Sequence, residues 1–174
     1  MATRLQKTKL RAVAQLAQFC VRNPDLLTDN LIPQTLGIAI RKLHDFGNSD
    51  LGKGKYLGHA FWSRRARILL AKNGGTDNGI KLHLAHEHVI PVKLVVDELL
   101  ALKPESKITE FERLIRRLSR VAIITREEEI KMLRPVKLSQ APSERWYFKD
   151  PWWRYRKAKL LRSIVDESGR RVDA

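Results

Sequence analysis

The sequence predicts a mostly helical α+β domain with a small sheet of two or three strands. Three observations support this fold class. Most apolar residues recur at intervals of three and four, which is the spacing of one buried helix face. Only two segments carry the signature of a strand. The composition of 43% hydrophobic and 30% charged residues is typical of a globular chain, and 174 residues suit one domain with an appendage.

The helices are delimited by prolines, glycines and capping residues. The first is expected to stop before Pro24, and Pro104 breaks a later one. Thr125 and Glu128 match a capping box, in which each residue satisfies a backbone N–H near the helix start. The expected helices are residues 5–21, 34–46, 60–72, 92–102, 108–118 and 125–133.

The two expected strands differ in character. Residues 80–86 alternate apolar and polar side chains, whereas residues 121–124 are short, apolar and β-branched, as in a buried strand. Residues 1–140 are therefore predicted to form one basic α+β domain, and residues 141–174 a basic, aromatic extension packed on it. Trp152 and Trp153 either anchor this extension to the core or stack on unpaired bases.

The net charge of +15 points to a polyanionic partner. A nucleic-acid backbone is the expected partner, because cationic side chains that neutralise its phosphates release counterions. DNA is expected ahead of RNA. An anionic membrane surface is the rival, but no apolar run reaches the 18–20 residues of a span, so no membrane partner is predicted. The single Cys20 excludes an internal disulfide and a cysteine-rich zinc site. A cytoplasmic location follows by default, and the sequence is compatible with a monomer or a homodimer.

Basic residues gather where acids are absent. The segment from Leu51 to Thr76 contains no acid, and the helix within it is expected to contact phosphate, although a solvated face is the simpler alternative. The residues predicted to bind nucleic acid are Lys53, Lys55, Arg64, Arg65, Arg67, Arg154 and Arg156.

The most unusual local sequence holds three of the five histidines within six residues, at positions 83, 86 and 88. Side chains alternate along a strand, so His86 and His88 share one face and Glu87 lies on the other. Two histidines on one face suit a divalent metal, and a histidine beside an acid suits general base catalysis. Alternatively, the histidines are ordinary half-buried residues and Glu87 pairs with an arginine.

The segment Glu87-His88-Val89-Ile90-Pro91 resembles the first strand of the HNH, or ββα-metal, nuclease family. The resemblance implies that His88 is the general base and that Glu87 helps to hold a divalent metal. Residues 121–124 would be the second strand, and the helix after it would supply Glu128 or Glu129 as a further ligand, with His86 nearby. The implied cofactor is Mg²⁺ or Mn²⁺, with Zn²⁺ as an alternative.

The chain departs from the family pattern in its later residues. No Asn follows Asn78 and no His follows His88, so a glutamate would have to replace the family's last histidine. Carboxylates suit a hard metal, and the replacement is chemically reasonable. Two functions remain open. One is a metal-dependent endonuclease that hydrolyses DNA phosphodiesters in restriction or defence. The other is a non-catalytic DNA- or RNA-binding module, in which Glu128 and Glu129 only cap a helix.

Overall fold

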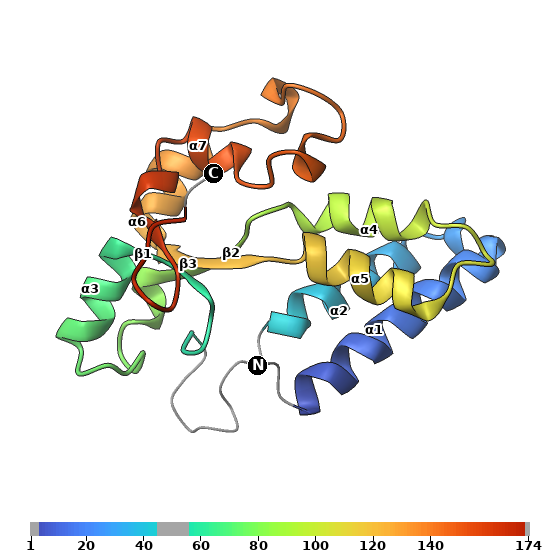
Figure 1. Ribbon diagram of the computed structural model, residues 1–174, viewed down its shortest axis with the longest axis horizontal. Helices are drawn as coiled ribbons and strands as arrows, with labels where there is room; N and C mark the ends of the chain where they lie inside the picture. Colours follow the sequence, from blue (N-terminus) through green and yellow to red (C-terminus); the bar gives the residue numbers. More distant parts are fainter. Residues whose placement is uncertain (1–3, 45–55, 173–174) are drawn as a thin grey trace. The chain divides into compact units, whose positions relative to one another are not determined.

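The computed structural model of the protein describes residues 4–44 and 56–172 (Figure 1). The predicted fold class is confirmed, because the chain is mostly helical and carries one small sheet. That sheet has four strands among the described residues, rather than two or three. The chain divides into two compact units that alternate along the sequence, Met1–Phe46 with Ile90–Arg120, and Gly47–Val89 with Val121–Ala174. The predicted boundary at residue 140 falls inside the second unit.

The first unit is a cluster of four helices, in which short turns join α1 to α2 and α4 to α5. Helix α1 packs against each of the other three, and α4 packs against both α2 and α5. The helices are α1 (Arg4–Arg22), α2 (Leu31–His44), α4 (Val92–Leu100) and α5 (Ile108–Leu118). A 3-10 turn, η1 (Pro24–Leu27), follows α1. Apolar residues at helical spacing, such as Leu36 and Ile40 on α2 or Phe111 and Ile115 on α5, are buried as one face of each helix.

Side chains also fasten the turns of this unit. Gln18 Nε2 donates to the carbonyl of Ser106 at 2.7 Å, and Arg22 Nε donates to that of Pro104 at 3.0 Å. These bonds give partners to backbone carbonyls in the turn between α4 and α5, which lie outside the helical hydrogen-bond pattern.

The second unit is built on a sheet with the strand order β2-β3-β1-β4. Strand β1 (Phe61–Ser63) pairs in parallel with β3 (Val121–Thr125) and antiparallel with β4 (Ile164–Val165). Strand β2 (Leu84–His88) pairs antiparallel with β3, in the register His88 to Val121 through Leu84 to Thr125. The two strands expected from the sequence are therefore adjacent in the sheet.

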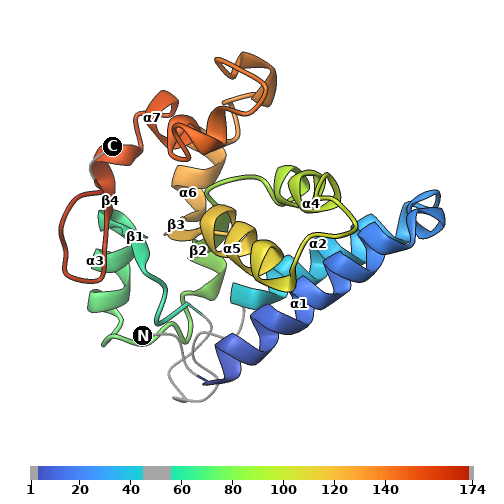
Figure 2. The ribbon, with the colours of Figure 1, turned by 45° about the vertical axis from the view of Figure 1, so that its right-hand side comes forward.

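Each face of this sheet is covered by its own helices (Figure 2). Helix α3 (Arg64–Lys72) contributes Ala66, Leu69 and Leu70 to the core on one face. The other face carries the short α6 (Arg126–Glu128), the π-helical turn η4 (Glu129–Leu133) and α7 (Trp153–Lys157). A core cluster there joins Ala85 and Ala122 of the sheet to Trp152 and Tyr155. The interpretation of Trp152 as a core anchor is confirmed, since it is 4% exposed.

Short 3-10 turns complete the second unit. The turn η3 (Lys81–His83) precedes β2, and η5 (Leu138–Gln140) and η6 (Trp146–Phe148) lead to α7. The turn η7 (Leu161–Ser163) leads into β4. The expected strand over residues 80–86 thus begins four residues late, and the expected helix over 60–72 begins at Arg64, because residues 61–63 form β1.

Candidate functional site

The strand pair β2–β3 runs directly into α6 through a capping box. The Thr125 side chain accepts from the N–H of Glu128 at 3.1 Å, and the Glu128 carboxylate accepts from the N–H of Thr125 at 2.9 Å. This reciprocal capping ends β3 and starts the helix at one residue. The result is a strand–strand–helix arrangement that places Glu87 of β2 and Glu129 of η4 in one electrostatic environment.

Glu87 lies on the sheet face that carries α6 and α7. Its Oε1 is 3.5 Å from Arg154 Nη1, and the two side chains are 26% and 12% exposed. Burial raises the pKa of Glu87, the Arg154 guanidinium opposes that rise, and the negative charge of Glu129 adds to it. The net pKa lies above the ordinary glutamate value, so Glu87 is a better proton acceptor than a solvated glutamate.

Glu129 is held by two arginines at the edge of the same face. Arg126 Nη1 donates to Oε2, while Arg134 donates to Oε1 from Nε at 3.1 Å and from Nη2 at 2.9 Å. Burial alone raises the pKa of Glu129, but the hydrogen bonds from Arg134 and Arg126 outweigh it and leave the pKa below its ordinary value. As pH falls, Glu129 therefore keeps its negative charge longer than Glu87 does.

The π-helical turn explains why Glu129 and Arg134 meet. The N–H of Arg134 bonds the carbonyl of Glu129 at 2.9 Å, five residues back, and the two side chains also pair. In a regular α-helix, side chains pair at three or four residues. Such π-helical turns recur at functional sites, because they displace side chains from helical register.

Tyr155 brings a phenol into this cluster from α7. It is fully buried, and its Oη has no hydrogen-bond partner among the described residues. Burial and the nearby charges of Glu87, Glu128 and Glu129 raise the pKa of Tyr155 well above its ordinary value, while Arg154 opposes the rise. The phenol consequently keeps its proton and remains a hydrogen-bond donor.

Glu128 has a structural position. It is 2% exposed, and its Oε2 accepts from Ser63 Oγ at 2.6 Å as well as from Thr125. Ser63 is itself the N-cap of α3 and accepts from the N–H of Ala66 at 3.1 Å. The predicted capping box of Thr125 and Glu128 is confirmed, and the same carboxylate also joins the start of α6 to that of α3.

His86 and His88 lie on the opposite face of β2 from Glu87. The His86 ring is 4.8 Å from that of His59 and 5.7 Å from that of His88, both edge to face. His59 and His88 are buried at 8% and 9% exposure. Glu129 is thus near enough to Glu87 to influence its pKa, whereas His86 and His88 lie with His59 on the other side of the strand.

The predicted nucleic-acid contacts fall into different environments. Arg64 and Arg65 are exposed on α3, whereas Arg67 donates to the carbonyls of Asp166 at 3.2 Å and Glu167 at 3.5 Å. Arg156 pairs with Asp150 at 2.9 Å. Arg154 is nearly buried beside Glu87, and Lys53 and Lys55 lie outside the described residues.

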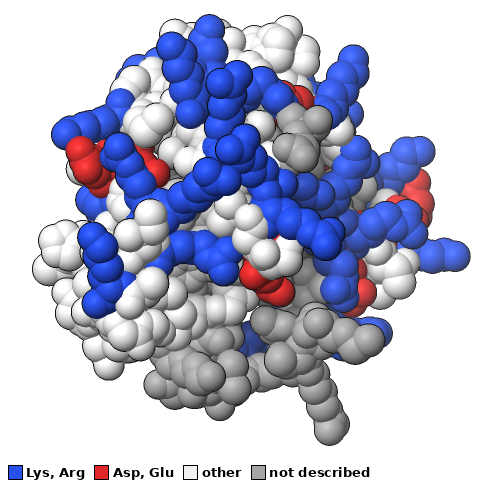
Figure 3. Space-filling model, turned by 60° about the vertical axis from the view of Figure 1, so that its left-hand side comes forward, with Lys and Arg blue, Asp and Glu red and all other residues white. Residues whose placement is uncertain are grey.

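Cations dominate the surface on the side of α3. Figure 3, which brings the left-hand side of Figure 1 forward, shows crowded Lys and Arg side chains with few acids between them. The second unit supplies many exposed cations, namely Arg64, Arg65, Lys72, Arg126, Lys131, Arg134, Arg162, Arg170 and Arg171. A surface of this kind attracts polyanions over a distance of about a Debye length, which is ~8 Å at physiological ionic strength.

Glu87 offers oxygen donors of the kind that Mg²⁺ or Mn²⁺ prefers, and its 3.5 Å contact with Arg154 is long for a charge-assisted hydrogen bond. Both oxygens of Glu129, in contrast, are bonded to Arg126 and Arg134. Within residues 4–44 and 56–172, no three His, Cys, Asp or Glu side chains converge to form a complete ligand set. An ion here would thus take water and phosphate oxygens as its remaining ligands, as Mg²⁺ commonly does.

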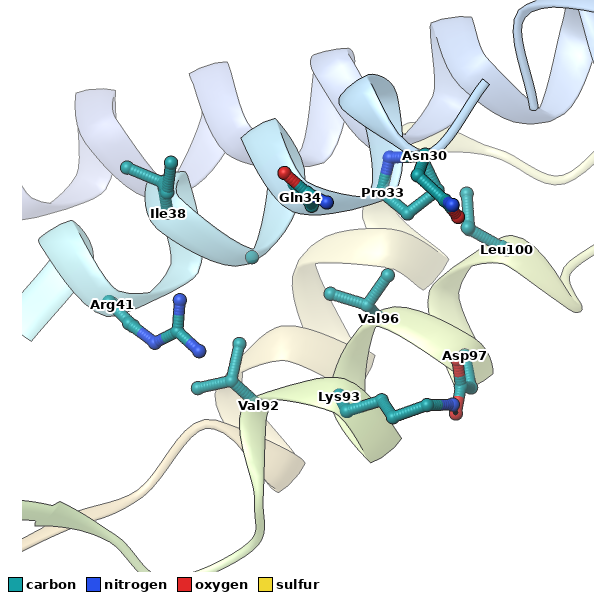
Figure 4. Close-up of a pocket in the computed structure, with 11 residues that line it drawn as sticks. Asn30, Pro33, Gln34, Ile38, Arg41, Val92, Lys93, Val96, Asp97 and Leu100 are labelled. Carbon is teal, nitrogen blue, oxygen red and sulfur yellow. Dashed lines mark hydrogen bonds and ion pairs between the residues drawn. The ribbon is translucent and has the colours of Figure 1, made fainter. Parts of the chain in front are cut away.

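A groove in the first unit carries no residue predicted for the site. It lies between α2 and α4, with an accessible volume of about 600 Å³. Figure 4 shows Val92 and Val96 facing Pro33 and Ile38 across it, with the Arg41 side chain above Val92. The ion pair between Lys93 and Asp97, at 2.8 Å, lies on its rim.

Sequence reasoning missed three members of the acidic cluster. Tyr155 was one of many aromatics in the tail, and Arg126 and Arg134 flanked a predicted helix without any pattern to distinguish them. The available signal was the run of three glutamates, Glu127 to Glu129, just after a buried strand. Two arginines, three residues before and five after the third glutamate, would have identified it as a paired acid.

No helix within the described ranges is both long enough and apolar enough to cross a membrane. Comparison with models of known protein families finds no match to this chain. Comparisons with curated proteins and with solved structures also find none. The geometry and chemistry of the chain therefore carry the functional argument by themselves.

Proposed function

We propose that the protein is a metal-dependent endonuclease that hydrolyses nucleic-acid phosphodiesters at the cluster of Glu87, Glu129, Arg154 and Tyr155. The observation that carries the proposal is the half-buried pair of Glu87 and Arg154, 3.5 Å apart on the face of the sheet that carries α6 and α7. Burial and the charge of Glu129 raise the pKa of Glu87, while two arginines lower the pKa of Glu129, so the two pKa values are moved apart. Carboxylates separated in this way are suited to different roles in acid–base chemistry. Such perturbed groups are also concentrated at functional sites.

The net charge of +15 supports a phosphodiester as the substrate. A backbone that carries one charge per phosphate is attracted to the cationic surface of the second unit. The arginines beside the two carboxylates are suited to bind the non-bridging oxygens of a phosphate, because a guanidinium forms paired hydrogen bonds with such groups.

Each side chain has a distinct part in the proposed reaction. Glu87 accepts a proton from the attacking water as its oxygen bonds to phosphorus. The P–O bond to the leaving oxygen breaks, and that oxygen takes a proton from solvent water. Glu129 remains charged and is positioned by Arg126 and Arg134. Arg154 binds the phosphate, and Tyr155 keeps its phenolic proton within the buried cluster. When bound, Mg²⁺ or Mn²⁺ supplies positive charge that polarises the scissile phosphate.

The resemblance to HNH nucleases assigns the base to His88 instead, and that assignment stays a prediction. In its favour is the strand pair that leads into a helix, which is the order of elements that the resemblance implies. Against it is the alternation of β2, which directs His88 away from Glu87 and toward His86.

The experiment is to incubate the protein with plasmid DNA and with total RNA, in the presence of Mg²⁺, Mn²⁺ or EDTA. We expect metal-dependent cleavage. Glu87→Gln should slow it by about 10²–10⁴-fold, the usual contribution of a general base. Glu127→Gln is the matched control, because this exposed neighbour pairs only with Lys131 and Arg65 among the described residues. Its cleavage rate should stay within about twofold of the wild type.

Two outcomes would contradict the proposal. The first is wild-type protein that cleaves neither substrate with either metal. The second is a folded Glu87→Gln variant that cleaves at the wild-type rate. Melting curves of all variants separate a loss of chemistry from a loss of structure.

A non-catalytic nucleic-acid-binding module is the second candidate. It is favoured by one observation, that both oxygens of Glu129 are already bonded to Arg126 and Arg134. On this interpretation the acidic cluster only fixes α6 and α7 to the sheet. Salt-dependent binding of DNA or RNA that needs no metal and yields no product would support it.

A further inference from the structure

Helix α3 presents one continuous basic face that the proposed reaction does not use. Among the nine residues of α3, the exposed ones are Arg64, Arg65, Ile68, Ala71 and Lys72. At 100° per residue these positions form a stripe about 120° wide. The opposite side packs on the sheet through Ala66, Leu69 and Leu70. The helix is therefore amphipathic with a cationic outer face.

The middle of this stripe is apolar. Ile68 is 55% exposed, and helical spacing places it between Arg64 and Lys72, each four residues away. No acid occurs anywhere in the sequence of α3. The closest acidic contact is Glu127, whose Oε2 is 3.9 Å from Arg65 Nη1, and both side chains are more than half exposed. An exposed pair of this kind is weak and is exchanged readily for phosphate.

The helix is held firmly in its own unit. Ser63 caps its first turn and donates to buried Glu128 at 2.6 Å. On its flank, Arg67 bonds the carbonyls of Asp166 and Glu167, in a turn that the Asp166 carboxylate stabilises by accepting from Ser168 and Arg170. Arg67 thus supports the helix from the side, while the exposed stripe stays open to a partner.

We propose that α3 enters the major groove of B-form DNA, so that the substrate of the nuclease proposed above is duplex DNA. The inference rests on the nucleic-acid-binding part of that function. The major groove is about 12 Å wide and admits one α-helix. The major groove of A-form RNA is too narrow and deep for side chains to read. Arg64, Arg65 and Lys72 contact phosphates or base edges, and Ile68 contacts thymine methyl groups in the groove.

The test measures binding by fluorescence anisotropy in EDTA, where the proposed cleavage does not occur. The probes are a mixed-sequence DNA duplex, the RNA duplex of the same sequence and the single DNA strand. We expect the DNA duplex to bind about tenfold more tightly than the other two, because only its groove accepts the helix. Equal or tighter binding of duplex RNA or of the single strand would overturn the proposal, as would no binding at all.

A charge-matched pair of variants locates the contact. Arg64→Ala with Arg65→Ala should reduce the slope of log affinity against log salt by about 2, since each lost phosphate contact removes ~0.9. The control is Arg113→Ala with Arg116→Ala, two exposed arginines of α5 with the same change in charge. If the control lowers the slope as much as the α3 variant does, the inference fails.

A second comparison tests the groove itself. An alternating dA-dT duplex is compared with the dA-dU duplex, which differs only by the thymine methyl groups. The wild type should lose about threefold in affinity on the uracil duplex, the size expected for about one buried methyl group. Ile68→Ser should abolish this difference, and Leu82→Ser, at a residue of η3 that is 85% exposed, should retain it. A wild type indifferent to the methyl groups would contradict the position of Ile68.

These results separate the two proposals. Normal cleavage by a protein whose α3 variants bind like the wild type would remove the inference and leave the nuclease. Binding that depends on α3, without cleavage under any metal, would remove the nuclease and leave the inference.

Discussion

The two faces of strand β2 carry ionisable side chains in contrasting environments. On one face Glu87 is paired with Arg154, which opposes but does not cancel the rise in its pKa caused by burial and by the charge of Glu129. On the other face His86 lies between the rings of His59 and His88, at centroid distances of 4.8 and 5.7 Å. Residues adjacent in sequence therefore belong to different sites, and the motif Glu87-His88 is divided by the sheet.

The difference teaches how to interpret a short acid–histidine motif. Strand geometry directs neighbouring side chains to opposite faces, so adjacency along the chain separates them in space. The groups that do meet Glu87 come from segments more than 40 residues later in the chain, namely Glu129 and Arg154. The acidic face is thus defined by the packing of α6, η4 and α7.

The largest effect is expected from the residue that joins the acidic face to the core. Tyr155→Ala should lower the free energy of unfolding by about 3–5 kcal/mol, as for other buried aromatics. Tyr155→Phe is the control, because its Oη has no hydrogen-bond partner among the described residues, and it should cost less than about 1 kcal/mol. Urea denaturation measures both. If Tyr155→Ala left the free energy of unfolding unchanged, α7 would not pack on this face of the sheet as described.

A smaller loss is expected at the residue that joins the starts of two helices. Glu128→Gln weakens charge-assisted bonds from Ser63 and Thr125, and should lower the free energy of unfolding by about 1.5–3 kcal/mol. Glu127→Gln, one residue away and exposed, should leave the melting temperature unchanged. Equal melting temperatures for both variants would contradict the capping role of Glu128.

The smallest effect is a pH dependence of opposite sign for the two coupled acids. Because the pKa of Glu87 is raised in the folded protein, its ionisation costs stability as pH rises above the ordinary value of 4.5. The pKa of Glu129 is lowered, so its charge contributes stability above 4.5 that is lost as pH falls through the lowered pKa.

Melting temperatures relative to the wild type should consequently change at pH values above 4.5 for Glu87→Gln and below 4.5 for Glu129→Gln, in opposite directions. The Glu87→Gln difference should shift in favour of the variant as pH rises, whereas the Glu129→Gln difference should shift against it. Parallel curves would mean that the two carboxylates share one environment. That result would remove the contrast on which their separate roles depend.

Local sequence signals predicted the strands and helices that form the site better than they predicted which side chains meet there. The β-branched run and the Thr125–Glu128 capping box located β3 and the start of α6, and residues 108–118 form α5 as expected. Helical and strand periodicity depend only on neighbours, so they can be recognised in one sequence. Strand β1, which lies between β3 and β4, was not predicted. It has only three residues, and an alternation of apolar and polar side chains cannot be recognised in so short a segment.

The side-chain partners could not be predicted for a related reason. The pairing of Glu87 with Arg154 joins residues 67 positions apart, and that of Glu129 with Arg134 requires a π-helical turn. Neither depends on local periodicity. The sequence did predict that β2 and β3 are neighbours, which the pairing confirms, because both segments carry local strand signals.

The central claim is that the acidic face of β2, and not its histidine face, carries out the chemistry. The measurement that tests it most directly is the rate of plasmid cleavage in Mg²⁺ by Glu87→Gln and by His88→Gln, each shown to be folded by its melting curve. The account predicts a loss of about 10²–10⁴-fold for Glu87→Gln and less than about tenfold for His88→Gln. Cleavage abolished by His88→Gln but retained by Glu87→Gln would contradict it, and would return the general base to the histidine.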